Sequence, residues 1–148
     1  ANKVYFTGYI SDEDLLKLYK CVDVAVFPSL YEPFGIVAIE GMLANVPVVV
    51  SDTGGLGGIV EHGVDGMKSY TGNANSLADS ILEILFNPDK AEQMKKRALE
   101  KVYRIYNWDV ISRQTLKVYE SIIEESKKAH WSSPIIKEEH TRYNSGLN

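Results

Sequence analysis

Two carboxylates and one helix start in the sequence have the chemistry of a site for a polyhydroxyl ligand. Glu32 precedes Gly35, where a predicted helix over residues 36–44 begins, and Glu40 lies within that helix. The first N–H groups of a helix have no partner inside it and favour anions and oxygen-rich ligands. Because the rest of the helix is apolar nearly all round, we expect Glu40 to need donors such as ligand hydroxyls to offset the cost of burial.

The elements that would position these residues alternate between strand and helix. Apolar runs predict strands over residues 4–7, 24–27 and 48–50. Ser11 and Asp14 have the spacing of an N-cap and an N3 residue, so a helix should follow the first strand. This alternation predicts an α/β fold with a doubly wound parallel sheet, whose ligands bind outside the carboxyl ends of the strands. Glu32, in the loop after the second predicted strand, lies at that edge.

The second half of the chain is predicted to be mainly helical. Gly54-Gly55 and Gly57-Gly58 indicate a flexible crossing, followed by a short helical piece at residues 59–61 and a turn at residues 63–66. The turn leads into residues 67–70, where the sheet signal ends, and helical spacing continues to the end of a long predicted helix over residues 108–129. We expect one partial domain over residues 1–129 and a loosely held tail over residues 130–148.

Composition and charge argue against several classes of function. The formal net charge of -4 is unlike that of a nucleic-acid-binding surface. A single cysteine, Cys21, excludes an internal disulfide and favours a reducing, cytoplasmic compartment. No apolar run approaches the ~20 residues that a transmembrane segment needs. Asp12-Glu13-Asp14 imitates a metal-binding Asp-x-Asp motif, but it follows Ser11 in a first helical turn, where acids complement the helix dipole, so we expect no metal site.

A set of short motifs resembles a known family. The motifs are Phe27-Pro28-Ser29, Tyr31-Glu32-Pro33-Phe34-Gly35, Glu40-Gly41-Met42, Pro47-Val48-Val49 and Gly54-Gly55. Together they resemble the carboxyl-terminal, nucleotide-sugar-binding lobe of the group 1 glycosyltransferases, and Tyr-Glu-Pro-Phe-Gly is similar to the glycogen- and starch-synthase-like members. The resemblance covers residues 4–108, and the last predicted helix resembles the one that crosses back to the amino-terminal lobe of these enzymes.

The resemblance implies a fold, an activity and roles for individual residues. It implies a Rossmann-like lobe of the GT-B fold and retaining transfer of a hexose, glucose from ADP- or UDP-glucose, to a saccharide acceptor without a metal or other cofactor. Glu32 would be the catalytic-site carboxylate that accepts hydrogen bonds from the donor sugar. The N–H groups of Phe34, Gly35 and Ile36 would meet the sugar and phosphate oxygens. Glu40 would hold the ribose, and Tyr9 and Ile10 would contact the nucleobase.

This sequence departs from the family pattern at two places. Gly58 stands where the family commonly has a glutamate, and the two strands that would precede residue 4, one with an Arg and a Lys for the leaving diphosphate, are not in this sequence. We therefore expect this chain alone to be inactive, since the acceptor-binding amino-terminal lobe is also missing. Either the chain belongs to a longer polypeptide, or residues 4–7 pair elsewhere in a swapped dimer. A non-catalytic scaffold domain and a sugar-nucleotide epimerase remain alternatives.

Overall fold

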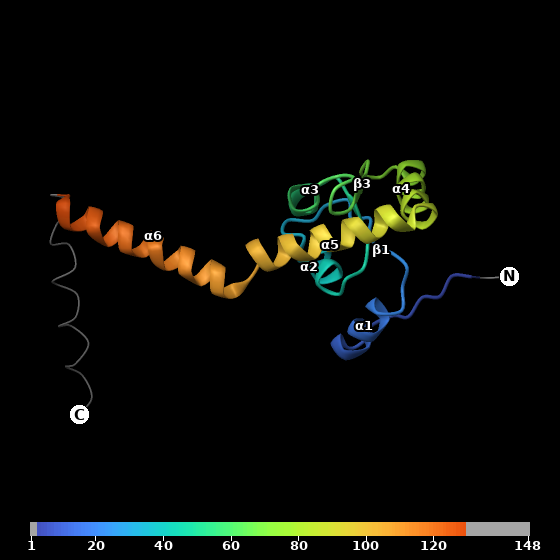
Figure 1. Cartoon of the computed structure of the whole chain (residues 1–148), viewed down its shortest axis with the longest axis horizontal. Helices are drawn as coiled ribbons and strands as arrows, with labels where there is room; N and C mark the ends of the chain where they lie inside the picture. Colours follow the sequence, from blue (N-terminus) through green and yellow to red (C-terminus); the bar gives the residue numbers. More distant parts are fainter. Residues whose placement is uncertain (1–2, 130–148) are drawn as a thin grey trace, which may run out of the picture. The chain divides into compact units, whose positions relative to one another are not determined.

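A three-stranded parallel sheet forms the centre of the computed structural model, which describes residues 3–129 (Figure 1). The strands are β1 (Ala25–Phe27), β2 (Val48–Ser51) and β3 (Met67–Ser69), in the spatial order β1-β2-β3. β2 is central and pairs Val48 with Ala25 and Val49 with Met67. The three parallel strands and their flanking helices confirm the predicted α/β class and an incomplete Rossmann-like sheet.

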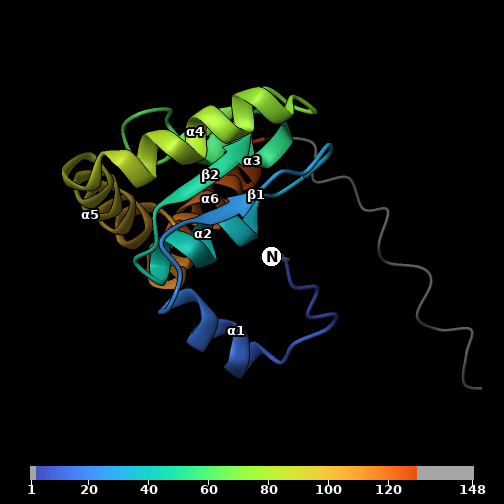
Figure 2. The same ribbon diagram turned by 90° about the vertical axis from the view of Figure 1, so that its right-hand side faces the viewer.

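Helices cover both faces of this sheet, as Figure 2 shows. The helices of the first unit, residues 1–107, are α1 (Asp12–Tyr19), α2 (Ile36–Leu43), α3 (Gly54–Ile59), α4 (Ala74–Phe86) and α5 (Pro88–Ile105), of which α2 to α5 share the apolar clusters of the sheet. A further helix, α6 (Trp108–Lys128), lies outside this unit. Successive side chains of a strand point to opposite faces. Val48 and Val50 belong to one apolar cluster with residues of α2, α3 and the second half of α5, whereas Val49 belongs to another with residues of α4 and the first half of α5. All three valines are 0% exposed, which explains the continuous apolar run in the sequence.

The helix predicted after Ser11 is confirmed as α1. The Ser11 hydroxyl oxygen accepts a hydrogen bond from the Asp14 N–H at 3.2 Å, and the acidic residues of the Asp12-Glu13-Asp14 run fill the first turn. At the other end of α1, Tyr19 is buried in the apolar cluster beside α2. This tyrosine therefore anchors α1 to the core.

The prediction of a strand over residues 4–7 is wrong for this structure. The segment has no regular secondary structure, and its side chains are exposed, with Phe6 97% accessible. A strand needs backbone partners on a neighbouring strand, and no described segment pairs with this one. The apolar pattern alone could not supply that partner.

The glycine-rich segment is also more ordered than the sequence predicts. α3 begins at Gly54, so the helix covers the expected flexible crossing and ends where the short helical piece was expected. Inside it, Gly57 N–H donates to Thr53 O at 3.1 Å, and its cap Val60 N–H donates to Leu56 O at 3.1 Å. Leu56 is fully buried, so tertiary packing overrides the poor helix propensity of glycine.

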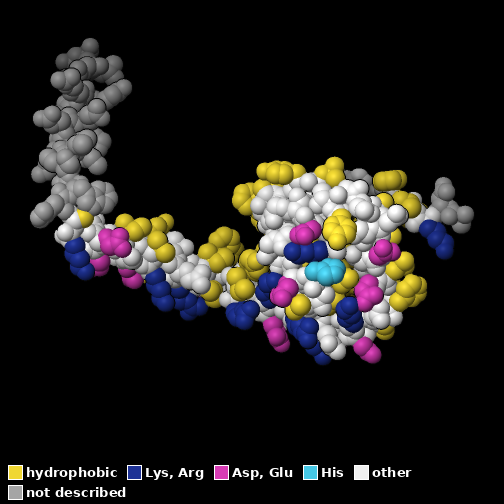
Figure 3. All heavy atoms as spheres, turned by 90° about the horizontal axis from the view of Figure 1, so that it is seen from above, with side chains coloured by type: hydrophobic (Ala, Val, Ile, Leu, Met, Phe, Trp, Pro, Cys, Tyr) yellow, Lys and Arg dark blue, Asp and Glu magenta, His cyan; other side chains and the backbone are white. Residues whose placement is uncertain are grey.

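The two edges of the sheet differ in their backbone hydrogen bonds. The backbone N–H and carbonyl groups of Lys68 point away from β2. The N–H donates to His62 Nδ1 at 2.9 Å, and the carbonyl oxygen accepts from the Ser80 hydroxyl at 3.1 Å. On the other side, the Ala25 N–H donates to the Pro47 carbonyl oxygen beside β2, so the alternation of the ladder turns the N–H and carbonyl groups of Val26 away from β2. No described strand pairs with β1 on that outer side. Figure 3 shows a face on which a histidine lies among basic and acidic side chains. Side chains thus cap the β3 edge, and β1 stays open.

The chain divides into two compact units, residues 1–107 and 108–148. Within the second unit the predicted long helix is confirmed as α6, which runs from Trp108 to Lys128, and none of its side chains is buried. The predicted tail over residues 130–148 lies outside the described residues. Among the helices that the structure describes, none is both long and apolar enough to cross a membrane.

Candidate functional site

The loop after β1 and the start of α2 form the centre of the candidate site. Gly35 is the N-cap of α2 and has a left-handed conformation with φ of 77°. Oε1 of Glu32 accepts hydrogen bonds from the N–H groups of Phe34, at 3.3 Å, and Gly35, at 3.1 Å. A carboxylate at this position is favoured by the positive end of the helix dipole. Glu32 therefore occupies the same donors that were predicted to meet a ligand, and a ligand oxygen must compete with it or bind beside it.

The Glu32–Gly35 loop, which comprises residues 32–35, rests directly on the start of α3. Gly55 N–H donates to the backbone oxygen of Glu32 at 2.8 Å. A Cβ atom at Gly55 would collide with the backbone carbonyl group of Phe34, and one at Gly35 would lie 2.8 Å from Ile59 Cδ1. Glycine is thus required where these two backbones touch, because any side chain would separate them. The contact fixes the loop at the carboxyl edge of the sheet.

Glu40 lies on α2 and is exposed, so the expectation that it is buried is wrong. The side of α2 that carries Glu40 lies near Tyr19 of α1 and is open to solvent. Ala38 and Met42 take the buried positions of the helix. Burial, and to a lesser extent the charge of Glu40, raise the pKa of the Tyr19 hydroxyl above its ordinary value. No hydrogen bond from another described residue reaches the Glu40 carboxylate, which leaves it accessible to ligand hydroxyls.

The remaining predicted site residues lie in two places, at the start of α2 and before α1. Ile36 is the first residue of α2, where its backbone lies beside those of Phe34 and Gly35. Tyr9 and Ile10 precede α1, and the side chain of Tyr9 is 93% exposed. The structure therefore brings Glu32, Phe34, Gly35 and Ile36 together, places Glu40 on the same helix, and leaves Tyr9 without a packed position.

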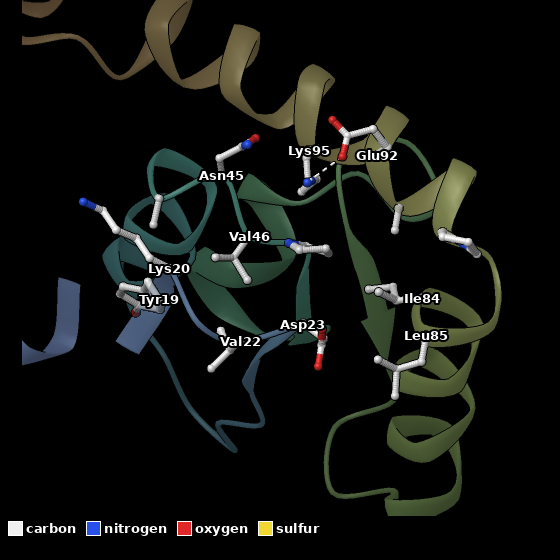
Figure 4. A pocket seen from close by; sticks show the side chains of 14 residues that line it. Tyr19, Lys20, Val22, Asp23, Asn45, Val46, Ile84, Leu85, Glu92 and Lys95 are labelled. Atoms are coloured by element: carbon white, nitrogen blue, oxygen red, sulfur yellow. Dashed lines mark ion pairs between the residues drawn. The ribbon is translucent and has the colours of Figure 1, made fainter. Parts of the chain in front are cut away.

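Cavities lie at both ends of the sheet. One of about 200 Å³ lies at the carboxyl ends of the strands and is lined by Pro28, Ser51 and Ser69 among others. A larger one of about 510 Å³, drawn in Figure 4, is lined by Asp23 and Val46, which precede β1 and β2, and by the paired Glu92 and Lys95 of α5. Ligands of parallel α/β sheets bind at the carboxyl ends of the strands. The larger cavity therefore does not belong to the candidate site.

Two supporting residues were missed by sequence reasoning. Lys68 Nζ donates to the backbone oxygen of Gly57 at 2.6 Å, and Lys101 Nζ donates to that of Ile59 at 2.5 Å. Each lysine lies far along the chain from the helix it contacts, so no local pattern could have indicated the pairing. Within the described part of the chain, no group of three His, Cys, Asp or Glu residues is arranged to hold a metal ion.

Comparison with known proteins gives consistent matches. Residues 1–101 match the family model "Glycosyl transferases group 1". The chain is 44% identical over 123 residues to the uncharacterized glycosyltransferase MJ1607 of Methanocaldococcus jannaschii, covering 83% of this chain and 32% of that protein. It is 34% identical over 114 residues to the glycogen synthase of Mycobacterium tuberculosis, covering 77% of this chain and 28% of that enzyme.

A solved structure with a bound nucleotide sugar is also similar. The structure of Anabaena Alr3699/HepE in complex with UDP-glucose matches with a TM-score of 0.73 and 30% sequence identity, covering 81% of this chain and 33% of that one. The chain thus spans about a third of the length of each of these three proteins.

Proposed function

The chain belongs to the group 1 glycosyltransferases, and we propose that it forms the nucleotide-sugar-binding part of a retaining enzyme that transfers glucose to a saccharide acceptor. The observation that carries this proposal is the position of the α2 amino terminus. It emerges at the carboxyl edge of a parallel sheet, with the Glu32 carboxylate on it and the exposed Glu40 further along the same helix. A helix amino terminus and two carboxylates suit a ligand with phosphates and many hydroxyls.

The proposed roles follow from this arrangement. Glu32 would accept hydrogen bonds from sugar hydroxyls through Oε2, since Oε1 already accepts from Phe34 and Gly35. The backbone at Gly35 and Ile36 would face the sugar and the distal phosphate, and Glu40 would bind the ribose. Tyr9 and Ile10 would contact the base, for which Tyr9 must move from its exposed position.

The donor we propose is UDP-glucose or ADP-glucose. The similar protein HepE is seen in complex with UDP-glucose, and another similar protein is a glycogen synthase, an enzyme named for a glucose polymer. We further propose that these 148 residues alone bind the donor without transferring its sugar, because they do not include the Arg and Lys that the family resemblance implies for the leaving diphosphate. The lone Cys21, a free thiol, supports a reducing, cytoplasmic setting.

Calorimetric titration of the chain with UDP-glucose, ADP-glucose and GDP-glucose tests the proposal. We expect weak binding that differs among the three bases, and a loss of about tenfold or more in affinity on Glu40→Ala, because hydrogen bonds to a charged group are lost. Glu100→Ala is the matched control, since Glu100 is also an exposed glutamate on a helix. Tyr9→Ala should weaken binding without changing the unfolding free energy.

Two outcomes would contradict the donor site. Equal affinity for all three nucleotide sugars would contradict the proposal that the chain recognises the base of the donor. No binding to any of them would favour a non-catalytic scaffold role for the same fold.

A further inference from the structure

α3 is a helix that its own sequence supports poorly. Four of its six residues are glycines, and glycine is the weakest helix former after proline. A helix of this length is also too short to persist in water by itself. Its position must therefore come from contacts with other elements.

Two lysines hold the carboxyl end of α3. Lys68 of β3 donates to the backbone oxygen of Gly57, and Lys101 of α5 donates to that of Ile59. Cations are favoured at this end of a helix, where the last carbonyl oxygens have no partner within the helix. The two lysines therefore supply from outside what the glycine-rich sequence lacks.

Each lysine is itself held by a carboxylate. Lys68 Nζ lies 3.1 Å from Asp52 Oδ1, and Lys101 Nζ lies 2.6 Å from Oδ2 of Asp65. Asp65 is only 4% exposed, and its Oδ1 accepts the N–H of Glu61 at 2.7 Å. The ion pairs and the low exposure of both lysine side chains, about a fifth or less, restrain the positions of the two lysine nitrogens.

The other end of α3 carries the Glu32–Gly35 loop. Gly55 N–H is bonded to Glu32, and a Cβ at Gly35 would lie 2.8 Å from Ile59 and 3.0 Å from Leu56 N. The backbones at Gly35 and Gly55 are in direct contact, with no flexible side chain between them. A shift of α3 would therefore move the loop as well. The position of the loop therefore depends on the position of α3.

We propose that Lys68 and Lys101 are positioning residues for the donor site, which they control by holding the carboxyl end of α3 and, through α3, the Glu32–Gly35 loop. Neither lysine needs to touch the donor. The inference rests on the proposed function for its consequence in binding, while its structural part can be measured without any ligand.

Three variants separate this role from general stabilisation. Lys68→Met removes one contact and leaves Asp52, which is 54% exposed, in contact with solvent. Lys101→Met is combined with Asp65→Asn, because an unpaired buried carboxylate would endanger folding. Lys95→Met is the matched control: Lys95 also lies on α5, is 21% exposed like Lys68, and pairs with Glu92 at 2.5 Å, but it donates to no carbonyl of α3.

Amide hydrogen exchange in the ligand-free chain is the first measurement. We expect about tenfold faster exchange at Gly35 and Gly55, whose N–H groups both donate to Glu32, in the Lys68 and Lys101 variants, the effect of losing a charge-assisted hydrogen bond. Exchange at Val49, in the buried centre of β2, should stay unchanged because it reports global unfolding. Lys95→Met should match the wild-type chain at all three amides. Unchanged exchange at Gly35 in both test variants would overturn the proposal.

Calorimetry with UDP-glucose and with UMP is the second measurement. In the proposed function the loop faces the sugar and the distal phosphate, both of which UMP lacks, so the test variants should lose about tenfold in affinity for UDP-glucose and less than about threefold for UMP. Lys68→Arg should restore affinity, since a guanidinium can still donate to Gly57. Faster exchange with unchanged UDP-glucose affinity would overturn the positioning role. A wild-type chain that binds no UDP-glucose, with faster exchange in the variants, would instead overturn the proposed function.

Discussion

Two stretches of the chain, one that contains Glu32 and Gly35 and one that leads to Tyr9, the residue proposed to contact the nucleobase, differ in how the fold holds them. Residues 32–35 lie in backbone contact with Gly54 and Gly55, whereas residues 4–9 are exposed, with Tyr9 93% accessible. Every partner of the first stretch lies within the described chain. The second stretch has no such partner, so its place in a site depends on a ligand or another segment. One part of the proposed site is therefore fixed by the fold and the other is not. Substitutions at the first part should lower the free energy of unfolding, whereas substitutions in the second should leave it nearly unchanged.

Gly55→Ala should change the free energy of unfolding most, because it disrupts the backbone contact between α3 and residues 32–35. The new methyl group would collide with the backbone of Phe34, and we expect a loss of roughly 2–4 kcal/mol in the free energy of unfolding. Gly58→Ala is the control: no atom lies within 4 Å of its added Cβ, so it should be neutral or stabilise by up to about 1 kcal/mol. Urea denaturation measures both. Equal effects of the two substitutions would remove the distinction between them.

The next effect concerns Tyr19, which joins α1 and the preceding exposed stretch to the core. Its pKa is raised in the folded chain by burial and by Glu40, while the unfolded chain has the ordinary value of about 10. The folded state therefore keeps the Tyr19 proton to higher pH, so the contribution of Tyr19 to the unfolding free energy is constant below about pH 10 and falls as pH rises further.

Tyr19→Phe should remove this part of the pH dependence. Tyr103→Phe, at a residue of α5 that is 60% exposed, should leave it in place. Denaturation curves on both sides of about pH 10 provide the measurement. A wild-type chain whose stability rises above that pH would show that the sign is wrong.

The smallest effect on stability is expected in the exposed stretch. Tyr5→Ser and Phe6→Ser together should change the unfolding free energy by less than about 0.5 kcal/mol, because their side chains are 86% and 97% exposed. The swapped dimer predicted from the sequence requires the opposite, because it would bury residues 4–7. In that case light scattering would find a dimer for the wild-type chain and a monomer for the double variant. A wild-type monomer would end the swapped-dimer hypothesis.

Strands and helices with strong local signals could be predicted from the sequence. The buried apolar runs became β1 and β2, and the apolar helix after Gly35 became α2. The prediction of a strand at residues 4–7 was wrong because a strand needs a neighbouring strand to pair with, and the local sequence does not show whether one is present. The helix α3 was not predicted because its support comes from contacts outside its own sequence, namely the burial of Leu56 and hydrogen bonds from lysines 11 and 42 residues away.

The candidate site was predicted to a similar extent. The motifs placed Glu32, Gly35 and Ile36 together, and the structure has them adjacent at one helix start. The exposure of Glu40 could not be predicted, because it depends on which side of α2 the neighbouring α1 leaves open. Contacts between elements, rather than the elements themselves, are what the local pattern lacks.

The caps that His62 and Ser80 place on β3 also limit how copies of this sheet can assemble. An open edge is a template for another strand, and a sheet with two open edges can add copies without end. Here the described sheet offers one open edge, at β1. Two copies joined through β1 would consume both open edges, so edge-to-edge association stops at a closed pair and does not propagate into a filament.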